Sequence, residues 1–349
     1  MWRLVPVLAV IGWIVGGAPV RAGDADGPNG TVAKALKAHG VTLRVDPKQP
    51  GQPIVTAELY SKTLGDDDLA LLKQLPKLRV LHVGSPVVTD QGLAHLRGLR
   101  HLEELRLGTN QYTDKAMEHV GALTQLRSLM LPEKVTDAGV ARLKGLTELR
   151  HLSLQIGCTD KSLETVKGFT RLESLRLSGW NYTDKALVHL KALTELREIT
   201  FFGTWITGAT LDQLAGLKKL RRLNLTPGRL AGPHLARLKV LPDLESLGLW
   251  GAGIKDDDLK HLKALPNLQE LNLWSTAIGD PGLAHLKALP KLRSLQLMNT
   301  RVTDTGLAHL HDMQSLTSIS LMGTKTTEDG RRALAKALPK AYITPAPKK

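Results

Sequence analysis

Residues 268–315 read LQELNLWSTAIGDPGLAHLKALPK and then LRSLQLMNTRVTDTGLAHLHDMQS, two copies of one 24-residue pattern. The L-x-x-L-x-L part of each copy ends in an alternation of apolar and polar residues, which is typical of a half-buried strand. The part that follows, as in Thr303–Leu310, spaces its leucines as a helix does. Each copy therefore predicts one short strand followed by one helix.

The same pattern continues along the chain with a period of 24 residues, apart from two units of 23 residues. A single unit has no opposing face against which it could bury its leucines, so neighbouring units must stack into one continuous core. The twelve units predict an α/β solenoid with a parallel β-sheet on its concave face and α-helices on its convex face. The motifs begin at Ile54, Leu78, Leu102, Leu126, Leu149, Leu172, Leu196, Leu220, Leu244, Leu268, Leu292 and Leu316.

A Thr-Asp pair opens many of the predicted helices. Threonine is a favoured N-cap residue, and an aspartate in the first turn is stabilised by the positive end of the helix dipole. These helix starts are therefore well specified. The pairs are Thr89-Asp90, Thr113-Asp114, Thr136-Asp137, Thr159-Asp160, Thr183-Asp184 and Thr303-Asp304.

The pattern closely resembles the leucine-rich-repeat family, in particular its bacterial 24-residue form with T-D-x-G-L-x-x-L helices, from Ile54 to about Thr327. The resemblance implies a right-handed horseshoe and a binding platform whose partners meet the concave side. Similar repeats occur in eukaryotic F-box substrate adaptors. An adaptor that lacks the F-box is therefore a further alternative, since the chain has no room for that domain.

The sequence predicts a cap at each end of residues 54–327. Within residues 23–53 we expect a disordered tail, a helix over 32–39, a strand over 41–45 and a linker rich in Pro and Gly. Within residues 328–349 we expect a helix over 328–338, a closing strand over 341–344 and a disordered basic tail.

Residues 1–22 have the features of a secretory signal peptide, with Arg3 before an apolar stretch and the small-residue end Val20-Arg21-Ala22. We expect cleavage after Ala22, with an uncleaved anchor as the alternative. No other segment is apolar enough to span a membrane. Cys158 is the single cysteine, so disulfide-bonded caps are impossible. Their absence favours a secreted or periplasmic protein of a bacterial envelope.

The formal net charge is +14, and removal of Arg3 and Arg21 with the signal peptide leaves +12 (14 minus 2). Such a charge favours acidic lipids, glycans or proteins over nucleic acid in an exported protein. The alternative is that the lysines and arginines only solvate the outer helices.

Three groups of residues that could carry chemistry are interpreted as structural. One is a histidine at the same helix position in six units; these side chains form a row and do not converge as zinc ligands must. Cys158 occupies a position that faces the core, and the Asp66–Asp68 and Asp256–Asp258 runs lie at helix starts. We expect no catalytic residue, no metal and no cofactor. The histidines are His95, His119, His189, His261, His285 and His309.

The residue that follows each strand becomes apolar in the later units. Trp250, Trp274, Met298 and Met322 occupy this position in four successive units, so they should form a ladder on or beside the concave face. Exposed tryptophan and methionine mark binding surfaces, although such side chains could also pack only on one another. We assign to this partner-binding surface Trp180, Phe202, Trp205, Trp250, Trp274, Met298, Met322, Arg176, Arg222 and Asn272.

Two hypotheses for function follow. The first is an exported scaffold without enzymatic activity that binds a protein partner through its concave face, on the basis of the solenoid and the ladder. The second is a binding module for an acidic glycan or envelope polymer, on the basis of the charge and the tryptophans. An enzyme is the least favoured class, because no nucleotide, zinc-protease or serine-hydrolase motif is present.

Overall fold

The structure is a computed structural model that describes residues 18–19, 30–108, 111–209, 211–226, 230 and 232–346. It divides into two compact units, residues 1–134 and residues 135–349. Most of the predicted signal segment lies outside the described residues, as does the predicted tail over 23–30, apart from Gly30, which begins α1. In the described part of the chain, no helix combines the length and the apolar character that crossing a membrane requires.

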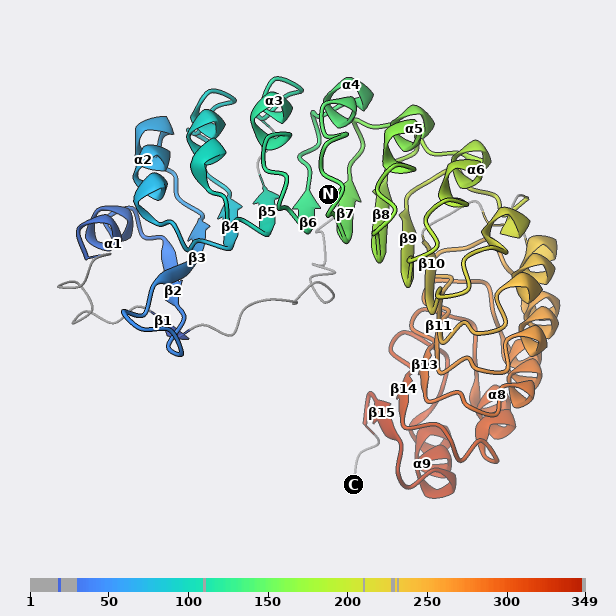
Figure 1. The fold of residues 1–349 in the computed structure, drawn as a ribbon. Coiled ribbons are helices and arrows are strands. Elements are labelled where there is room, and N and C mark those ends of the chain that lie inside the picture. The colour runs from blue at the N-terminus through green and yellow to red at the C-terminus, as the bar shows by residue number, and fades with distance from the viewer. Residues whose placement is uncertain are drawn as a thin grey trace. The chain divides into compact units, whose positions relative to one another are not determined.

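The first unit begins with antiparallel strands and continues with parallel ones (Figure 1). β1 (Ala18–Pro19) pairs with β2 (Thr42–Val45), and β2 pairs with β3 (Ile54–Leu59). From β3 onward each strand pairs in parallel with the next. The remaining elements are β4 (Val80–Val83), β5 (Glu104–Leu107), β6 (Ser128–Met130), α1 (Gly30–Lys37), α2 (Asp66–Ala70), η2 (Leu71–Gln74), η3 (Gly92–Gly98) and α3 (Met117–Val120).

The second unit contains strands β7 to β15, each parallel to its neighbours. The strands are β7 (His151–Leu154), β8 (Ser174–Ser178), β9 (Glu198–Phe202), β10 (Arg222–Thr226), β11 (Ser246–Gly248), β12 (Glu270–Asn272), β13 (Ser294–Gln296), β14 (Ser318–Ser320) and β15 (Tyr342–Thr344). The helical segments are α4 (Asp137–Ala141), η4 (Asp160–Ser162), α5 (Leu163–Val166), η5 (Asp184–Ala186), α6 (Leu187–Leu190), η6 (Leu211–Leu214), η7 (Gly232–Val240), η8 (Asp256–Ala264), α7 (Asp280–Ala284), η9 (His285–Ala288), α8 (Asp304–Leu307), η10 (Ala308–Leu310) and α9 (Glu328–Ala337).

The predicted α/β solenoid is confirmed in each unit. Strands β3 to β14 fall on the predicted leucine motifs, and helical segments connect them. In Figure 1 the strands of the second unit line the inner side of its arc and the helices line the outer side. The core lies between these two layers. Leu271 of β12 and Leu283 of α7, for example, have no exposed surface (0%).

Many of the connecting segments are 3₁₀-helical, where the sequence predicted α-helices. η3, η6, η7 and η8 are 3₁₀ over their whole length, whereas α2, α5, α6, α7 and α8 each adjoin a 3₁₀ segment. A 3₁₀-helix rises about 2.0 Å per residue against about 1.5 Å for an α-helix, so it spans the same distance with fewer residues. That property suits a short segment that must return the chain to the next strand.

The aspartate at the helix start, whether a threonine or Gly279 precedes it, has a role between repeats that was not predicted from the sequence. The Thr303 amide and hydroxyl donate to the two carboxylate oxygens of Asp280, one repeat earlier, at 2.7 and 2.6 Å. The same tie joins Thr183 to Asp160 and Thr327 to Asp304. The threonine hydroxyl also caps its own helix, as predicted. In these three repeats the threonine therefore closes a helix start and fastens it to the preceding repeat.

Candidate functional site

The aromatic–methionine ladder, which we define as Trp250, Trp274, Met298 and Met322, lies on four successive repeats of the second unit. The strands before these residues pair in register, which sets the four positions side by side. The residue after each ladder position is Gly251, Ser275, Asn299 or Gly323, and each has a positive φ between 53° and 71°.

This left-handed turn fixes the backbone of the ladder. The Gly251 amide donates to the Trp274 carbonyl at 2.9 Å, and the Ser275 amide donates to the Met298 carbonyl at 2.8 Å. The Asn272 side chain accepts a hydrogen bond from the Trp274 amide at 2.9 Å. Asn272, which was assigned to the surface itself, therefore also holds the ladder's backbone.

The aromatic rings of the ladder are stacked and extend to a residue outside it. Trp250 and Trp274 lie 4.7 Å apart between ring centroids at an interplanar angle of 12°. Phe202, two repeats before Trp250, reaches it at 5.8 Å. The Arg176 guanidinium carbon lies 5.2 Å from the centroid of the Phe202 ring. Phe202, Trp250 and Trp274 thus form one run of contacting rings, here called the ring stack, and Arg176 lies over its Phe202 end.

The ring stack is half-buried, and the methionines beyond it become progressively exposed. Phe202, Trp250, Trp274 and Met298 are intermediate in exposure, whereas the Met322 side chain is 56% exposed. The stacking uses one face of each tryptophan for an intramolecular contact, as the packing alternative requires. Met298 and Met322 continue the ladder on the next two repeats, and Met322 is its most exposed member.

Trp180 and Trp205 lie on loops and not at the ladder position. They follow β8 and β9 and are 66% and 47% exposed. The Trp205 amide donates to the Tyr182 carbonyl at 2.8 Å, so the backbone of the second loop is held by the first. Both tryptophans are therefore exposed on loops outside the ladder.

Charged side chains lie on the strands that precede the ladder. Arg222 of β10 is directly opposite Glu198 of β9 in the register, and Arg176 lies on β8. Burial raises the pKa of Glu198, and the nearby positive charges of Arg222 and Arg176 oppose that shift. Burial lowers the pKa of Arg176, opposed by Glu198. This group supplies charge and hydrogen-bonding capacity next to the ring stack.

A second cluster, which the sequence analysis missed, lies on the strand face of the first unit. Glu104 of β5 is 3% exposed, and its Oε1 lies 3.0 Å from His82 Nε2 and 2.8 Å from Arg106 Nε. Burial alone would raise the pKa of Glu104, but the His82 hydrogen bond and the Arg106 charge outweigh it and lower that pKa. The sequence could have indicated this cluster, because His82, Glu104 and Arg106 all occupy outward-facing positions on neighbouring strands.

The other residues considered for chemistry have structural surroundings. Cys158 is 1% exposed, and its Sγ lies 3.3 Å from the Val135 carbonyl oxygen. Asp68 and Asp258 accept the amides of Gly65 and Lys255, which closes the starts of α2 and η8. Among the described residues, no group of three or more His, Cys, Asp or Glu side chains is arranged to hold a metal ion.

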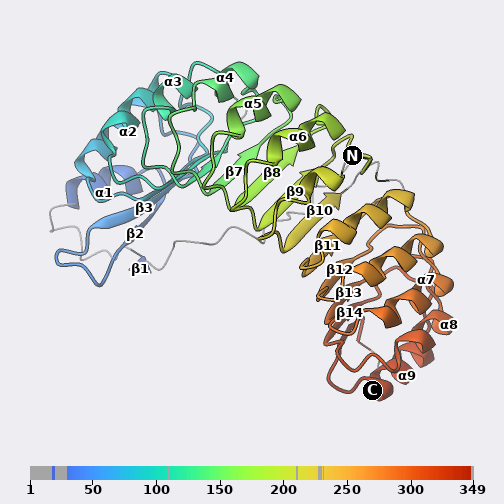
Figure 2. The same cartoon turned by 45° about the vertical axis from the view of Figure 1, so that its right-hand side comes forward.

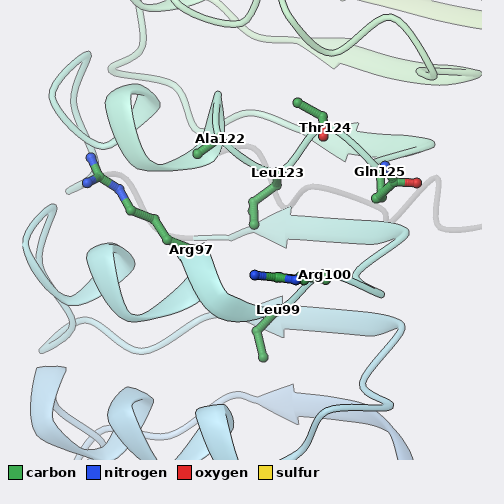
Figure 3. A pocket seen from close by; sticks show the side chains of 7 residues that line it. All are labelled: Arg97, Leu99, Arg100, Ala122, Leu123, Thr124 and Gln125. Carbon is green, nitrogen blue, oxygen red and sulfur yellow. The ribbon is translucent and has the colours of Figure 1, made fainter.

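The first unit also contains an open pocket of about 340 Å³ between the helix-to-strand loops of two neighbouring repeats (Figure 3). Two arginines, a threonine and a glutamine surround an apolar floor, and the lining contains no general base beside a nucleophile. The pocket therefore lacks the arrangement that covalent catalysis needs. Its lining residues are Arg97, Leu99, Arg100, Ala122, Leu123, Thr124 and Gln125.

Comparisons with known proteins agree with this architecture. The family model described as a leucine-rich repeat region matches residues 68–321. No curated protein matches the sequence significantly. Among solved structures, an internalin from Listeria monocytogenes aligns with a TM-score of 0.62 and 21% identity, over 92% of this chain and 94% of that chain. At such identity the likeness concerns the fold alone.

Two further solved structures align at lower TM-scores. A leucine-rich-repeat protein of Leptospira interrogans has a TM-score of 0.43 and 18% identity, over 78% of this chain and 80% of that chain. The plant peptide hormone receptor RGFR1 in complex with RGF2 has a TM-score of 0.45 and 14% identity, over 86% of this chain and 51% of that chain.

Proposed function

The chain belongs to the leucine-rich-repeat family, and from that premise we propose that it is a scaffold without enzymatic activity that binds a protein partner on the strand face of its second unit. Members of the family generally serve as binding scaffolds. The observation that carries the proposal is the ring stack and the methionines that continue it. Trp, Met and Arg are enriched where interfaces concentrate their binding energy.

The arrangement of the surface supports a protein in preference to a small ligand. The ladder crosses four successive repeats and its last member, Met322, is 56% exposed, whereas small-molecule sites are compact concave pockets. Arg176, Glu198 and Arg222 provide a polar border on the preceding strands. An apolar centre with a polar border is the usual composition of a protein–protein interface.

Photo-crosslinking tests the proposal directly. A photoreactive amino acid is placed at Met298 or Met322, and a matched control is placed at Val188 of α6, which is 50% exposed on the helical side of the same unit. We expect one discrete crosslinked protein species from both ladder positions in the native host and none of that species from Val188. The same species from all three positions, or none from the ladder, contradicts the proposal.

Removal of the rings gives a second measurement on the same surface. Once the crosslinked species is identified, its affinity is compared between wild type and a Trp250→Ala/Trp274→Ala variant. Loss of such anchors typically costs about 2 kcal/mol or more, which is roughly a thirtyfold loss of affinity. A Val188→Ala control should bind as wild type does. Unchanged affinity in the double variant would show that the rings only pack on one another.

We infer further that the protein is exported to the periplasm or the cell exterior of a bacterium. The support is the sequence of residues 1–22, with its basic start, apolar stretch and small-residue end. N-terminal sequencing of the protein isolated from the envelope fraction should give Gly23 as the first residue. Recovery of the chain in the cytosol with an intact leader contradicts the inference.

A further inference from the structure

A row of exposed lysines runs along the helical side of the second unit. Each lies at the end of the helical segment of its repeat, in the last turn, at the C-cap or just beyond it. Ala215 and His311 stand at the equivalent positions of two further repeats. We call this set the lysine row. It consists of Lys144, Lys167, Lys191, Lys239, Lys263 and Lys287, all of which are exposed.

The lysine row differs from the neighbouring surface positions in its ion pairing. At the start of the following strands, Arg150 pairs with Glu173 at 2.6 Å, and Lys219 pairs with Glu195 at 2.6 Å. These partners lie one repeat apart, so the two surface columns largely neutralise themselves. Among the described residues, the single ion pair of the lysine row joins Lys287 to Asp312 at 4.0 Å. The positive charge of the row is therefore left for a partner.

Helix capping does not account for the whole row. Cations are stabilised at helix C-termini, but α5 and α6 are only four residues long, and Lys167 and Lys191 lie at their C-caps. Such short helices align few peptide dipoles. Helices of neighbouring repeats pack about 8–10 Å apart, close to the Debye length of about 8 Å at physiological salt. The lysines therefore repel one another only weakly, and they can remain unpaired at little cost.

We propose that the lysine row is a second binding site, which takes an unbranched acidic polysaccharide lying across the repeats. A linear polymer with regularly spaced negative charges can follow a row of cations that recurs once per repeat. Its binding is driven by release of the small ions condensed on the polymer. Lys144, Lys167 and Lys191 lie at or just beyond the ends of α4, α5 and α6, and these helices follow one another along the outer side of the unit (Figure 2).

The surroundings of the row favour a polysaccharide over a nucleic acid. Proteins that bind single-stranded nucleic acids add aromatic platforms on which the bases stack. In the helix-side segments that carry the row, the aromatic residue is Phe169, and its side chain is 1% exposed. The exposed tryptophans of the unit lie with the strands and loops of its other side. The row thus offers charge without stacking surfaces.

The site is tested with polygalacturonate as the probe and the full chain as the protein. A Lys239→Gln/Lys263→Gln/Lys287→Gln variant removes three adjacent cations of the row. The matched control, Lys161→Gln/Lys185→Gln/Lys255→Gln, removes the same charge from exposed positions at the opposite ends of the helical segments. Circular dichroism and thermal unfolding establish that both variants fold as wild type does.

We expect the row variant to lose roughly tenfold or more in affinity for polygalacturonate at about 50 mM salt, and the control variant to lose far less. Wild-type binding should weaken steeply between about 50 and about 200 mM salt, and the row variant should show a smaller slope. The Trp250→Ala/Trp274→Ala variant should bind the polymer normally, which separates this site from the ring stack.

Three outcomes overturn the proposal. Equal losses in the row and control variants would show that net charge alone attracts the polymer. Tighter binding of a single-stranded oligonucleotide than of polygalacturonate would assign the row to nucleic acid. Absence of polygalacturonate binding by the wild-type protein at low salt would remove the site altogether.

Discussion

At the scale of single residues, an aspartate at the helix start links several repeats to the one that follows. Its two carboxylate oxygens accept the amide and the hydroxyl of one threonine, at 2.8 and 2.5 Å for Asp160 and Thr183. Charge-assisted hydrogen bonds of this kind are shorter and stronger than neutral ones. The glycine of the motif leaves space for the carboxylate, since a Cβ on Gly306 would lie 2.3 Å from Asp280 Oδ1.

Removal of one such aspartate should destabilise the second unit. Asp280→Ala leaves the partly buried Thr303 amide and hydroxyl without their acceptor, and we expect a loss of about 1.5–3 kcal/mol in the free energy of unfolding. Urea unfolding followed by circular dichroism measures it. Asp312→Ala is the control, because that side chain is 87% exposed and should change stability by less than about 0.5 kcal/mol. An equal loss of unfolding free energy in the two variants would show that the hydrogen bonds between Asp280 and Thr303 do not stabilise the unit.

The left-handed turn after β9 gives a second prediction for a single residue. Gly203 has a φ of +65°, and a Cβ added there would meet nothing within 4 Å, so strain from the backbone is the only cost of a side chain. Gly203→Ala should therefore lower stability by about 1 kcal/mol. Gly216 also has free space but no left-handed backbone, so Gly216→Ala should be neutral or slightly stabilising. Thermal unfolding of both variants measures the difference.

At the scale of elements, the parallel register decides which side chains meet. Val80 and His82 of β4 lie opposite Glu104 and Arg106 of β5, and this register brings three ionisable groups into one buried cluster. In the second unit the register instead aligns the strands that precede the ladder. Two strand faces with the same architecture thus differ in chemistry, because only their outward residues differ.

The Glu104 cluster predicts a pH dependence of stability. The pKa of Glu104 is lowered from its ordinary value of 4.5, because the His82 hydrogen bond and the Arg106 charge outweigh burial. The ionised carboxylate therefore stabilises the fold above that value, and its contribution is lost as the pH falls through the lowered pKa. We therefore measure the free energy of unfolding in urea between about pH 6 and about pH 3. As the pH falls, this free energy should decrease less steeply for Glu104→Gln than for wild type.

A solvent-exposed carboxylate serves as the control for this experiment. Glu195 pairs with Lys219 at the surface, with the Glu195 side chain 42% exposed, so screening by water should leave little effect on stability. The free energy of unfolding of Glu195→Gln should accordingly fall with pH as steeply as that of wild type. The same steepness in Glu104→Gln would contradict the role given to the cluster.

The elements were largely predictable from the sequence, because the leucine period marks strands β3 to β14. The predicted closing helix over 328–338 corresponds to α9 (Glu328–Ala337), and the predicted helix over 32–39 begins two residues earlier as α1 (Gly30–Lys37). The 3₁₀ character of η7 and η8 was not predicted, because leucine spacing does not separate the two helix types over two or three turns.

The candidate surface was only partly predictable. The alignment of repeats placed Trp250 and Trp274 on adjacent strands, but it could not show that their rings stack at 4.7 Å. Nor could it show that Phe202 reaches Trp250 across an intervening repeat, since that contact depends on side-chain rotamers.

The hydrogen bonds from threonine to the aspartate of the preceding repeat were not predicted for a related reason. A Thr-Asp pair satisfies the rules for a helix start within one repeat, so nothing in the pattern required a partner in another.

At the scale of the whole molecule, stability is shared among repeats that each contact mainly their neighbours. In such an array a local defect loosens the repeats beside it before it affects distant ones. This behaviour differs from that of a globular domain with one central core, in which a single cavity weakens the whole structure.

A core substitution in the second unit tests this behaviour. Leu271 of β12 has no exposed surface, so Leu271→Ala should cost about 2.7–5 kcal/mol through the cavity that it leaves. Hydrogen exchange should speed up mainly in the repeats that contain β11, β12 and β13. Amides in β3 and β4 of the first unit should exchange as in wild type. Uniform acceleration over both units would show that the chain unfolds as one cooperative body instead.

The position after each strand is free to vary in a way that the leucines are not. Across the repeats it is occupied by tyrosine, glycine, proline, glutamine, serine, phenylalanine, threonine, tryptophan and methionine, while the motif leucines stay nearly constant. In the last repeats a left-handed turn holds the backbone there whether the side chain is an indole or a thioether. The side chain at this position can therefore be exchanged in one repeat without a change of backbone. An engineer could rewrite what the protein recognises, one repeat at a time, without redesigning its core.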